Sequence, residues 1–405
     1  MRTRTTCTLA LFLAACQSTY SQVAPSATNG TADLRYSIRY SETAEFGGTL
    51  GNWHTIAPSA SLDYANGRKR FPFSAEYAGG YTAALSGPAY STGVFQHLLL
   101  SQGLNLRKWN FAINDDISYR PQSPTTGFSG IPGTGEPIGS EAGLPPSQLI
   151  LTLNTHVLDN VAGGQLRHML NYRSILNVEA NHDLLHFPDS NGLDTSSAMA
   201  STGVDFRLDA RTSLMTQYTF SQFSYSSYDF HIRTNAVTAG FSKSWTRWFH
   251  TSAAVGPEWV NSSKNVIMPP STGVTANADL GYQRRQTSVD LNYARQISAG
   301  SGYMVGSESD TVSASLSREL NRAFTIEMNG GYRQTSQLAT TWNVSGAFGG
   351  VQASRRIGRN LNAFVNYTAM SQKSSMQPAP ANVLNELMNT LSCGIGFTKE
   401  LKSIR

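Results

Sequence analysis

Charged residues are scarce in this chain, and long apolar runs are missing from it. Asp, Glu, Lys and Arg make up 14% of the 405 residues, whereas a soluble globular protein usually carries about 25%. No stretch reaches the roughly 18 consecutive apolar residues that a membrane-spanning helix needs. These absences exclude a helical membrane protein. They leave a transmembrane β-barrel, in which only alternate residues must be apolar, or a secreted β-solenoid or sandwich.

Cysteine is also scarce, and no basic block is present. Cys7, Cys16 and Cys393 are too few and too scattered for a disulfide framework. The net charge of +5 is spread along the chain, so the sequence predicts no nucleic-acid partner.

Motifs for catalysis or for metal and cofactor binding are missing as well. His182 and His186 are four residues apart, but on a strand that spacing separates them by roughly 13 Å. Serine is so abundant that no particular Ser–His pairing stands out, and no Gly-rich loop joins a strand to a helix. The sequence therefore predicts no catalytic residue, no metal site, no cofactor and no enzyme.

The N-terminus has the pattern of an export signal over residues 1–21. Two arginines precede a short apolar run that is too short to cross a bilayer. The residues before Cys16 resemble a lipobox, which predicts cleavage there and lipidation of Cys16; the alternative is ordinary cleavage near Ser21. Residues 22–33 are predicted to be a polar tail in the periplasm.

What the chain does have is a period of two, seen most clearly over residues 308–374. Phe324, Ile326 and Met328 alternate with Thr325 and Glu327. Such alternation is typical of a strand whose two faces meet different surroundings. Similar runs fill most of the chain. The predicted strands are 34–44, 53–65, 71–84, 92–103, 106–119, 160–170, 174–187, 197–209, 212–225, 229–244, 248–261, 273–284, 286–298, 309–319, 323–335, 341–356, 360–373 and 387–400.

The connections between these strands alternate between short and long, which is the pattern of short periplasmic turns and longer external loops in outer-membrane barrels. The short ones are rich in Arg and Lys, although basic residues also protect the strand edges of soluble sheets. One of them, Asn66-Gly67, predicts a tight hairpin. We therefore predict an all-β fold, a transmembrane antiparallel up-and-down β-barrel of about 18 strands over residues 34–400, with both termini periplasmic.

The longest interruption is predicted over residues 121–158. Its first part, 121–146, contains six prolines and six glycines, which cannot pair as a central strand. A loop of this length is usually functional or disordered. We predict that it lies outside the barrel or folds into it.

The alternation also predicts which side chains line the lumen. Apolar residues must face lipid, so the charged residues of opposite parity face inward. Acids outnumber bases among them, which predicts a wet lumen with a mild preference for cations or neutral polar solutes. The predicted lumen-lining residues are Asp116, Glu179, Asp183, Asp205, Arg207, Asp209, Glu258, Asp279, Asp290, Glu327 and Arg333. Aromatic residues near strand ends, such as Trp109, Trp245, Trp259 and Trp342, are candidates for the girdle at the membrane–water interface.

The segments 309–318, 280–285 and 349–359 resemble the porin-like bacterial outer-membrane β-barrel proteins, in particular an uncharacterised group of them. The resemblance covers most of residues 34–400, but it implies no catalytic or ligand residue. The chain departs from many such barrels at its end, Lys-Glu-Leu-Lys-Ser-Ile-Arg405, where an aromatic residue often stands.

The sequence thus favours an outer-membrane channel for passive passage of small polar solutes. The alternative is the exit barrel of a system that exports polysaccharide or another polymer; an outer-membrane enzyme or a structural barrel is a more distant possibility. The expected partners are outer-membrane lipid and lipopolysaccharide, the barrel assembly machinery, and the small solutes or exported polymer.

Overall fold

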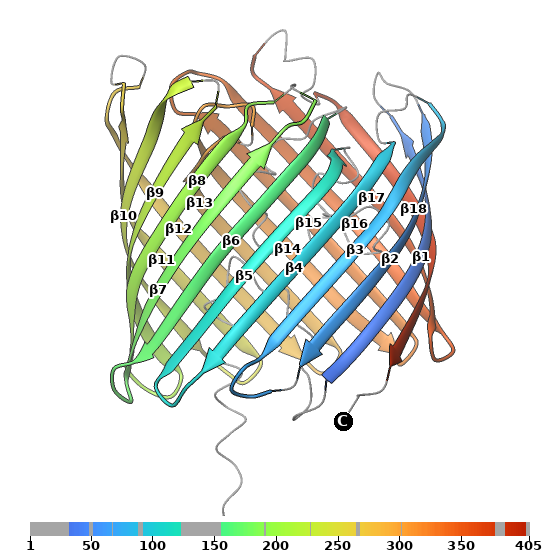
Figure 1. Ribbon diagram of the computed structural model, residues 1–405, viewed down its shortest axis with the longest axis horizontal. Helices are drawn as coiled ribbons and strands as arrows, with labels where there is room; N and C mark the ends of the chain where they lie inside the picture. Colours follow the sequence, from blue (N-terminus) through green and yellow to red (C-terminus); the bar gives the residue numbers. More distant parts are fainter. Residues whose placement is uncertain are drawn as a thin grey trace, which may run out of the picture.

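The computed structural model of the chain describes residues 32–47, 52–66, 68–87, 92–122, 155–189, 192–226, 228–264, 268–300, 302–376 and 385–401. In them, eighteen antiparallel strands form one continuous sheet (Figure 1). The predicted signal peptide, the lipobox at Cys16 and the polar tail up to residue 31 lie outside the described residues. The strands are β1 Ala32–Phe46, β2 Trp53–Asn66, β3 Phe73–Ser86, β4 Gly93–Asn105, β5 Trp109–Gln122, β6 Thr155–Met169, β7 Ser174–His186, β8 Thr195–Arg207, β9 Thr212–Tyr225, β10 Tyr228–Ser244, β11 Phe249–Ser262, β12 Ser271–Arg284, β13 Thr287–Ser298, β14 Ser307–Asn321, β15 Phe324–Gln337, β16 Asn343–Ile357, β17 Leu361–Ser374 and β18 Leu387–Leu401.

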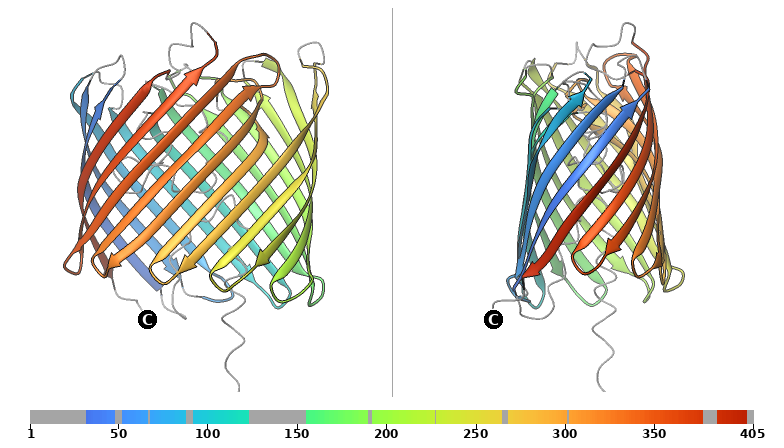
Figure 2. Two further views of the ribbon diagram at one scale, coloured as in Figure 1. Left: turned by 180° about the vertical axis from the view of Figure 1, so that it is seen from behind. Right: turned by 90° about the vertical axis from the view of Figure 1, so that its right-hand side faces the viewer.

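The sheet closes on itself. Each strand pairs with the next along the chain, and β1 pairs with both β2 and β18. Ile38 of β1, for example, lies opposite Ala60 on one side and Phe397 on the other. The barrel is wider in one direction than in the other, so that two broad walls face each other (Figure 2). Closure satisfies every strand edge, which is the condition for a sheet to cross hydrocarbon.

The two faces of every strand differ in the way that the period of two predicts. Large apolar side chains point out of the barrel and are exposed on nearly every strand, whereas their neighbours in sequence point inward and are mostly polar. Among the exposed outward residues are Ile38, Leu62, Tyr77, Val94, Ile113, Val178, Val204, Tyr218, Val237, Val255, Val274, Leu291, Val312, Met328, Val351, Val365 and Leu391. Contact of such an outer face with lipid is favourable, whereas its contact with water is unfavourable.

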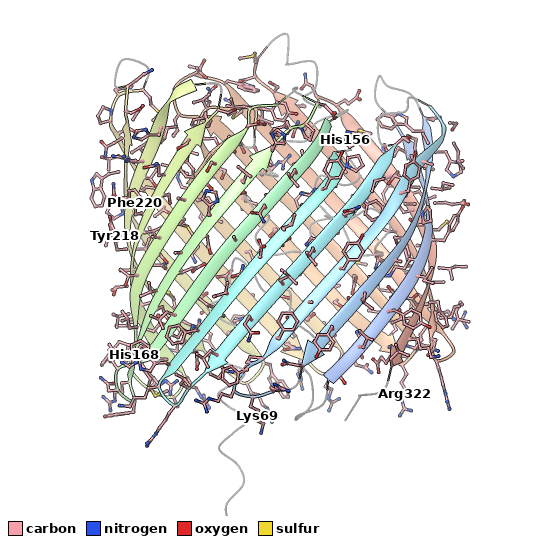
Figure 3. The ribbon with its side chains drawn as sticks, viewed as in Figure 1. Lys69, His156, His168, Tyr218, Phe220 and Arg322 are labelled. Atoms are coloured by element: carbon pink, nitrogen blue, oxygen red, sulfur yellow. The ribbon has the colours of Figure 1, made fainter. Side chains whose placement is uncertain are left out.

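The two ends of the barrel differ in their connections. At one end the strands are joined by short turns, and Ala32 and the C-terminal end of β18 lie at this end (Figure 1). We call it the short-turn end, and the other the long-loop end. In Figure 3, Lys69, His168 and Arg322 lie at the short-turn end and His156 at the long-loop end. None of the described residues forms a helix long and apolar enough to cross a membrane.

Three local expectations were wrong. The connection after Asn66 is no two-residue hairpin, because β3 begins only at Phe73; the side-chain oxygen of Asn66 accepts the N–H of Phe73, and Arg70 and Pro72 accept backbone bonds from the β4 end. The long loop was predicted too wide, since β5 runs to Gln122 and β6 begins at Thr155. Its residues 123–154 lie outside the described part of the chain.

The third wrong expectation concerns the aromatic girdle. Trp109, Trp245 and Trp259 are exposed on the outer face, as predicted. Trp342 instead is 7% exposed and packs with Met304 and Val344, and its ring N–H donates to the hydroxyl of Ser374. It belongs to the interior packing at the long-loop end.

Candidate functional site

The inward face of the barrel is polar, and several of its strands carry rows of uncharged polar side chains. On β14 the successive inward residues are Ser309, Thr311, Ser313, Ser315 and Ser317. Further along the sheet, β16 and β17 add amides and hydroxyls, among them those of Gln352, Asn366 and Thr368. Hydroxyl and amide groups can donate or accept hydrogen bonds without a net charge. These uncharged polar side chains can therefore hydrogen-bond a cationic, an anionic or a neutral solute.

The strands β2 to β8 carry most of the inward carboxylates that sequence reasoning missed. Asp63 and Glu76 are register partners on β2 and β3. Asp159 of β6 is also buried on the inward face. On β4, His97 bonds Asp116 of β5, with Nε2 and Oδ1 2.7 Å apart. The period-two pattern extended to β2, β3 and β6 would have found the three acids.

The predicted lumen residues can now be placed. All except one lie on the inward face of a strand: Asp116 on β5, Glu179 and Asp183 on β7, Asp205 and Arg207 on β8, Glu258 on β11, Asp279 on β12, Asp290 on β13, and Glu327 and Arg333 on β15. Asp209 is the exception, because β8 ends at Arg207 and Asp209 lies in the turn that follows. There its carboxylate accepts the N–H groups of Arg211 and Thr212, and the N–H of Arg211 above all lowers the pKa of Asp209.

Several of these carboxylates are bonded to neutral groups. The side-chain amide of Asn181 donates to Glu179 over 2.9 Å, and that of Asn177 donates to Asp205 over 2.8 Å. A neutral donor orients a carboxylate but does not cancel its charge. These hydrogen bonds hold the two carboxylates in place on the inward face of the barrel.

Arg333 differs from the other predicted lumen residues by its burial. Its side chain is 1% exposed and donates to the side-chain oxygen of Gln372 on β17 over 2.8 Å. A guanidinium enclosed in this way fixes neighbouring strands more than it contacts solutes.

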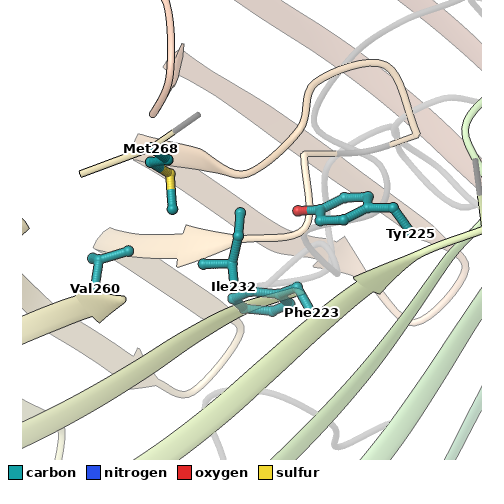
Figure 4. Packing of buried hydrophobic residues seen from close by; sticks show 5 residues of the cluster. All are labelled: Phe223, Tyr225, Ile232, Val260 and Met268. Carbon is teal, nitrogen blue, oxygen red and sulfur yellow. The ribbon is translucent and has the colours of Figure 1, made fainter. Parts of the chain in front are cut away.

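The mouth at the long-loop end is narrowed by a segment that folds inward, residues 302–306. The carbonyl of Gly302 accepts the N–H of Leu193 over 2.7 Å, and the ring of Tyr303 meets that of Phe187 edge to face at 5.6 Å. Next to it, Phe223, Ile232 and Val260 form an apolar cluster with two further residues (Figure 4). The segment thus connects β13 and β14 with the opposite wall near β7.

The closed sheet, its apolar exterior and its polar interior together decide the architecture. The chain folds as a closed antiparallel β-barrel of eighteen strands, an architecture that crosses outer membranes. In the described residues of this barrel, no three His, Cys, Asp or Glu side chains gather in a group that could hold a metal ion.

Comparison with known proteins gives structural neighbours only. No family model and no curated protein matches the chain. Among solved structures, OccK2 (OpdF) of Pseudomonas aeruginosa is 11% identical, with a TM-score of 0.49 over 92% of this chain and 100% of that one. The structure of OccK2 in complex with glucuronate is 12% identical, with a TM-score of 0.48 over 92% of this chain and 100% of that one. OccAB2 of Acinetobacter baumannii has 8% identity and a TM-score of 0.49, over 92% and 98%.

Proposed function

We propose that the barrel is a passive channel of the bacterial outer membrane for small polar solutes. The observation that carries this proposal is the contrast between the two faces of one closed sheet. Apolar side chains such as Ile113 and Val255 are 66% and 56% exposed on the outside, while the inside presents hydroxyl, amide and carboxylate groups. A polar interior can hold water, and water-filled barrels conduct small solutes.

The orientation belongs to the same proposal. Short turns face the periplasm in outer-membrane barrels and longer loops face outward. We place the short-turn end, and with it both termini, in the periplasm. Lipopolysaccharide then surrounds the long-loop end, and insertion requires the barrel assembly machinery.

The inward acids support a preference for cations and neutral polar solutes over anions. The negative potential of groups such as Glu179 and Asp205 is not cancelled by the amides that bond them, and charged rings or walls of one sign select ions of the other sign. The inward segment 302–306 favours small solutes over an exported polymer, since it narrows the mouth on one side. Nothing in this arrangement calls for an enzymatic role.

Reconstitution of the purified mature chain tests the proposal. Planar bilayers should show discrete conductance steps, and liposomes that contain the protein should swell in small sugars but not in large dextrans. A folded protein that gives no conductance and no swelling would refute the channel, and free passage of the large dextrans would favour the polymer-export alternative.

A further inference from the structure

The short-turn end carries cations that lie directly on aromatic rings. Nζ of Lys243 is 4.1 Å from the ring centre of Trp245. The guanidinium carbons of Arg247 and Arg284 are 4.3 Å and 5.9 Å from the ring centre of Trp248. We call these five residues the turn patch. Turns β10–β11 and β12–β13 build it together, since the carbonyl of Trp248 accepts the N–H of Gln283.

The aromatic rings of the turn patch lie where the outer face of the barrel ends. Trp245 is 49% exposed, and its ring N–H donates to the hydroxyl of Thr251, an outward residue of β11. Indole rings favour the boundary between hydrocarbon and headgroups. Stacking against them holds the three cations at headgroup depth, where phosphate oxygens lie.

The same pairing recurs at other turns of this end. The guanidinium of Arg70 lies 5.5 Å from the ring centre of Phe71, and that of Arg173 lies 5.2 Å from the ring centre of Tyr172. Both rings are well exposed. Exposed apolar groups beside cations suit a lipid boundary better than a fully aqueous partner.

The charge of the turn patch is left available. In the described part of the chain, Lys243, Arg247 and Arg284 take part in no ion pair. Asp209 in the neighbouring turn interacts with Lys243, but the pKa of Asp209 is lowered mainly by the N–H of Arg211 and least by Lys243. At the long-loop end, by contrast, the outward Arg295 is paired with Glu308 over 2.8 Å and Asp310 over 3.3 Å.

From these observations we propose that the turn patch binds anionic phospholipid, with the phosphate of the headgroup on Arg247, Arg284 and Lys243 and the acyl chains along the outer face beside Trp245. The choice of leaflet rests on the orientation proposed above. In that orientation the turn patch lies in the periplasmic leaflet, which consists of phospholipid. The lipid preference itself rests on neither the orientation nor conduction.

Native mass spectrometry of the full folded chain in detergent tests the proposal, with dioleoylphosphatidylglycerol and dioleoylphosphatidylcholine as probes. Wild type should bind the phosphatidylglycerol more tightly. The double variant Arg247→Gln/Arg284→Gln should lose most of this preference, by about fivefold for each cation removed. The variant Arg233→Gln/Lys373→Gln removes the same charge from the outer face at the long-loop end and should keep the preference.

In gel electrophoresis, a folded barrel migrates faster before boiling than after it, which shows whether each variant is folded. If the double variant misfolds, the single variants Arg247→Gln and Arg284→Gln replace it, and each should lose about fivefold of the preference. Equal binding of the two lipids by wild type would overturn the proposal. So would unchanged preference in Arg247→Gln/Arg284→Gln. Loss of binding to isolated peptidoglycan in that variant, without any lipid preference in wild type, would assign the turn patch to a carboxylate polymer instead.

Discussion

At the scale of single residues, the outer face holds one feature that a lipid surface does not favour. Asp115 of β5 points outward near the middle of its strand, and the side-chain amide of Asn160 on β6 donates to it over 2.8 Å. A carboxylate in this position is costly unless it is hydrogen-bonded. Asn160 therefore acts as the partner that makes Asp115 tolerable.

Removing this partner should be more harmful than removing the pair. We expect Asn160→Ala to lower the free energy of unfolding by about 1–3 kcal/mol, because the carboxylate then loses a donor that lipid cannot replace. Asp115→Ala/Asn160→Ala should lose less than the sum of its two single variants. Urea unfolding in phospholipid vesicles measures all three. Tyr218→Phe is the control, because it breaks a neutral outward pair with Asn235 and should cost less; strict additivity at Asp115 and Asn160 would contradict the account.

Acid should loosen a second residue pair, which lies outside the membrane. Asp189 accepts the ring N–H and the backbone N–H of His156, at 2.7 Å and 2.9 Å, and the ring bond is the main reason why the pKa of Asp189 is lowered. A lowered carboxyl pKa stabilises the folded state above the unfolded value, about 3.9, and this contribution is lost as the pH falls further toward the folded value.

We therefore expect the connection after β7 to open more often below about pH 4 than at neutral pH. Hydrogen exchange at the amide of His156, corrected for its intrinsic pH dependence, should show faster opening in acid. Asp189→Asn should open equally at both pH values. Persistence of the acid effect in Asp189→Asn would assign it to another group.

At the scale of elements, each strand separates two environments, and one step along the chain changes sides. Val312 on β14 faces outward and is 42% exposed, whereas the next residue, Ser313, faces inward opposite Gly331. Val312→Arg should lower the free energy of unfolding by about 2–4 kcal/mol, the cost of an arginine against the centre of a bilayer.

Ser313→Arg is the matched control, because it brings the same side chain to the same depth on the inward face. It should cost much less, since the lumen is polar and can hydrate the guanidinium. Vesicle unfolding compares the two variants directly. A larger loss at Ser313 would show that the faces have been assigned the wrong way round, and similar losses at the two positions would show that β14 does not border lipid.

The period of two was enough to locate the strands, because lipid and water impose it on each strand separately. It could not locate contacts between side chains on different strands. His97 and Asp116 meet because β4 and β5 pair in a particular register, which no local pattern encodes. Trp342 was misplaced for a similar reason: its surroundings come from the inward segment that carries Met304. Asn66-Gly67 failed because the basic residues and Pro72 that follow it extend the turn.

At the scale of the whole molecule, the inward face carries carboxylates on many strands, from Asp63 on β2 to Glu327 on β15, beside rows of hydroxyls such as that of β14. A solute that crosses the barrel meets acids as well as neutral donors and acceptors. For the proposed channel we expect solutes that carry an amine or several hydroxyl groups to pass more readily than anions, because the amide partners of Glu179 and Asp205 leave the charges of these carboxylates in place.

Neutralising two of these acids should reduce ion selectivity while the barrel stays open. The interaction energy between one unit charge and an ion roughly 8 Å away in water is about 0.5 kcal/mol. This energy changes the local concentration of the ion about twofold. In Glu179→Gln/Asp205→Asn we therefore expect the permeability ratio of potassium to chloride, measured from the reversal potential across a salt gradient, to fall several-fold. Asp209→Asn removes a charge from the turn outside the lumen and should leave the ratio unchanged. Of the three substituted residues, Glu179 and Asp205 face the path of the ion and Asp209 does not. If both variants changed the permeability ratio alike, the selectivity would therefore come from the overall charge of the protein.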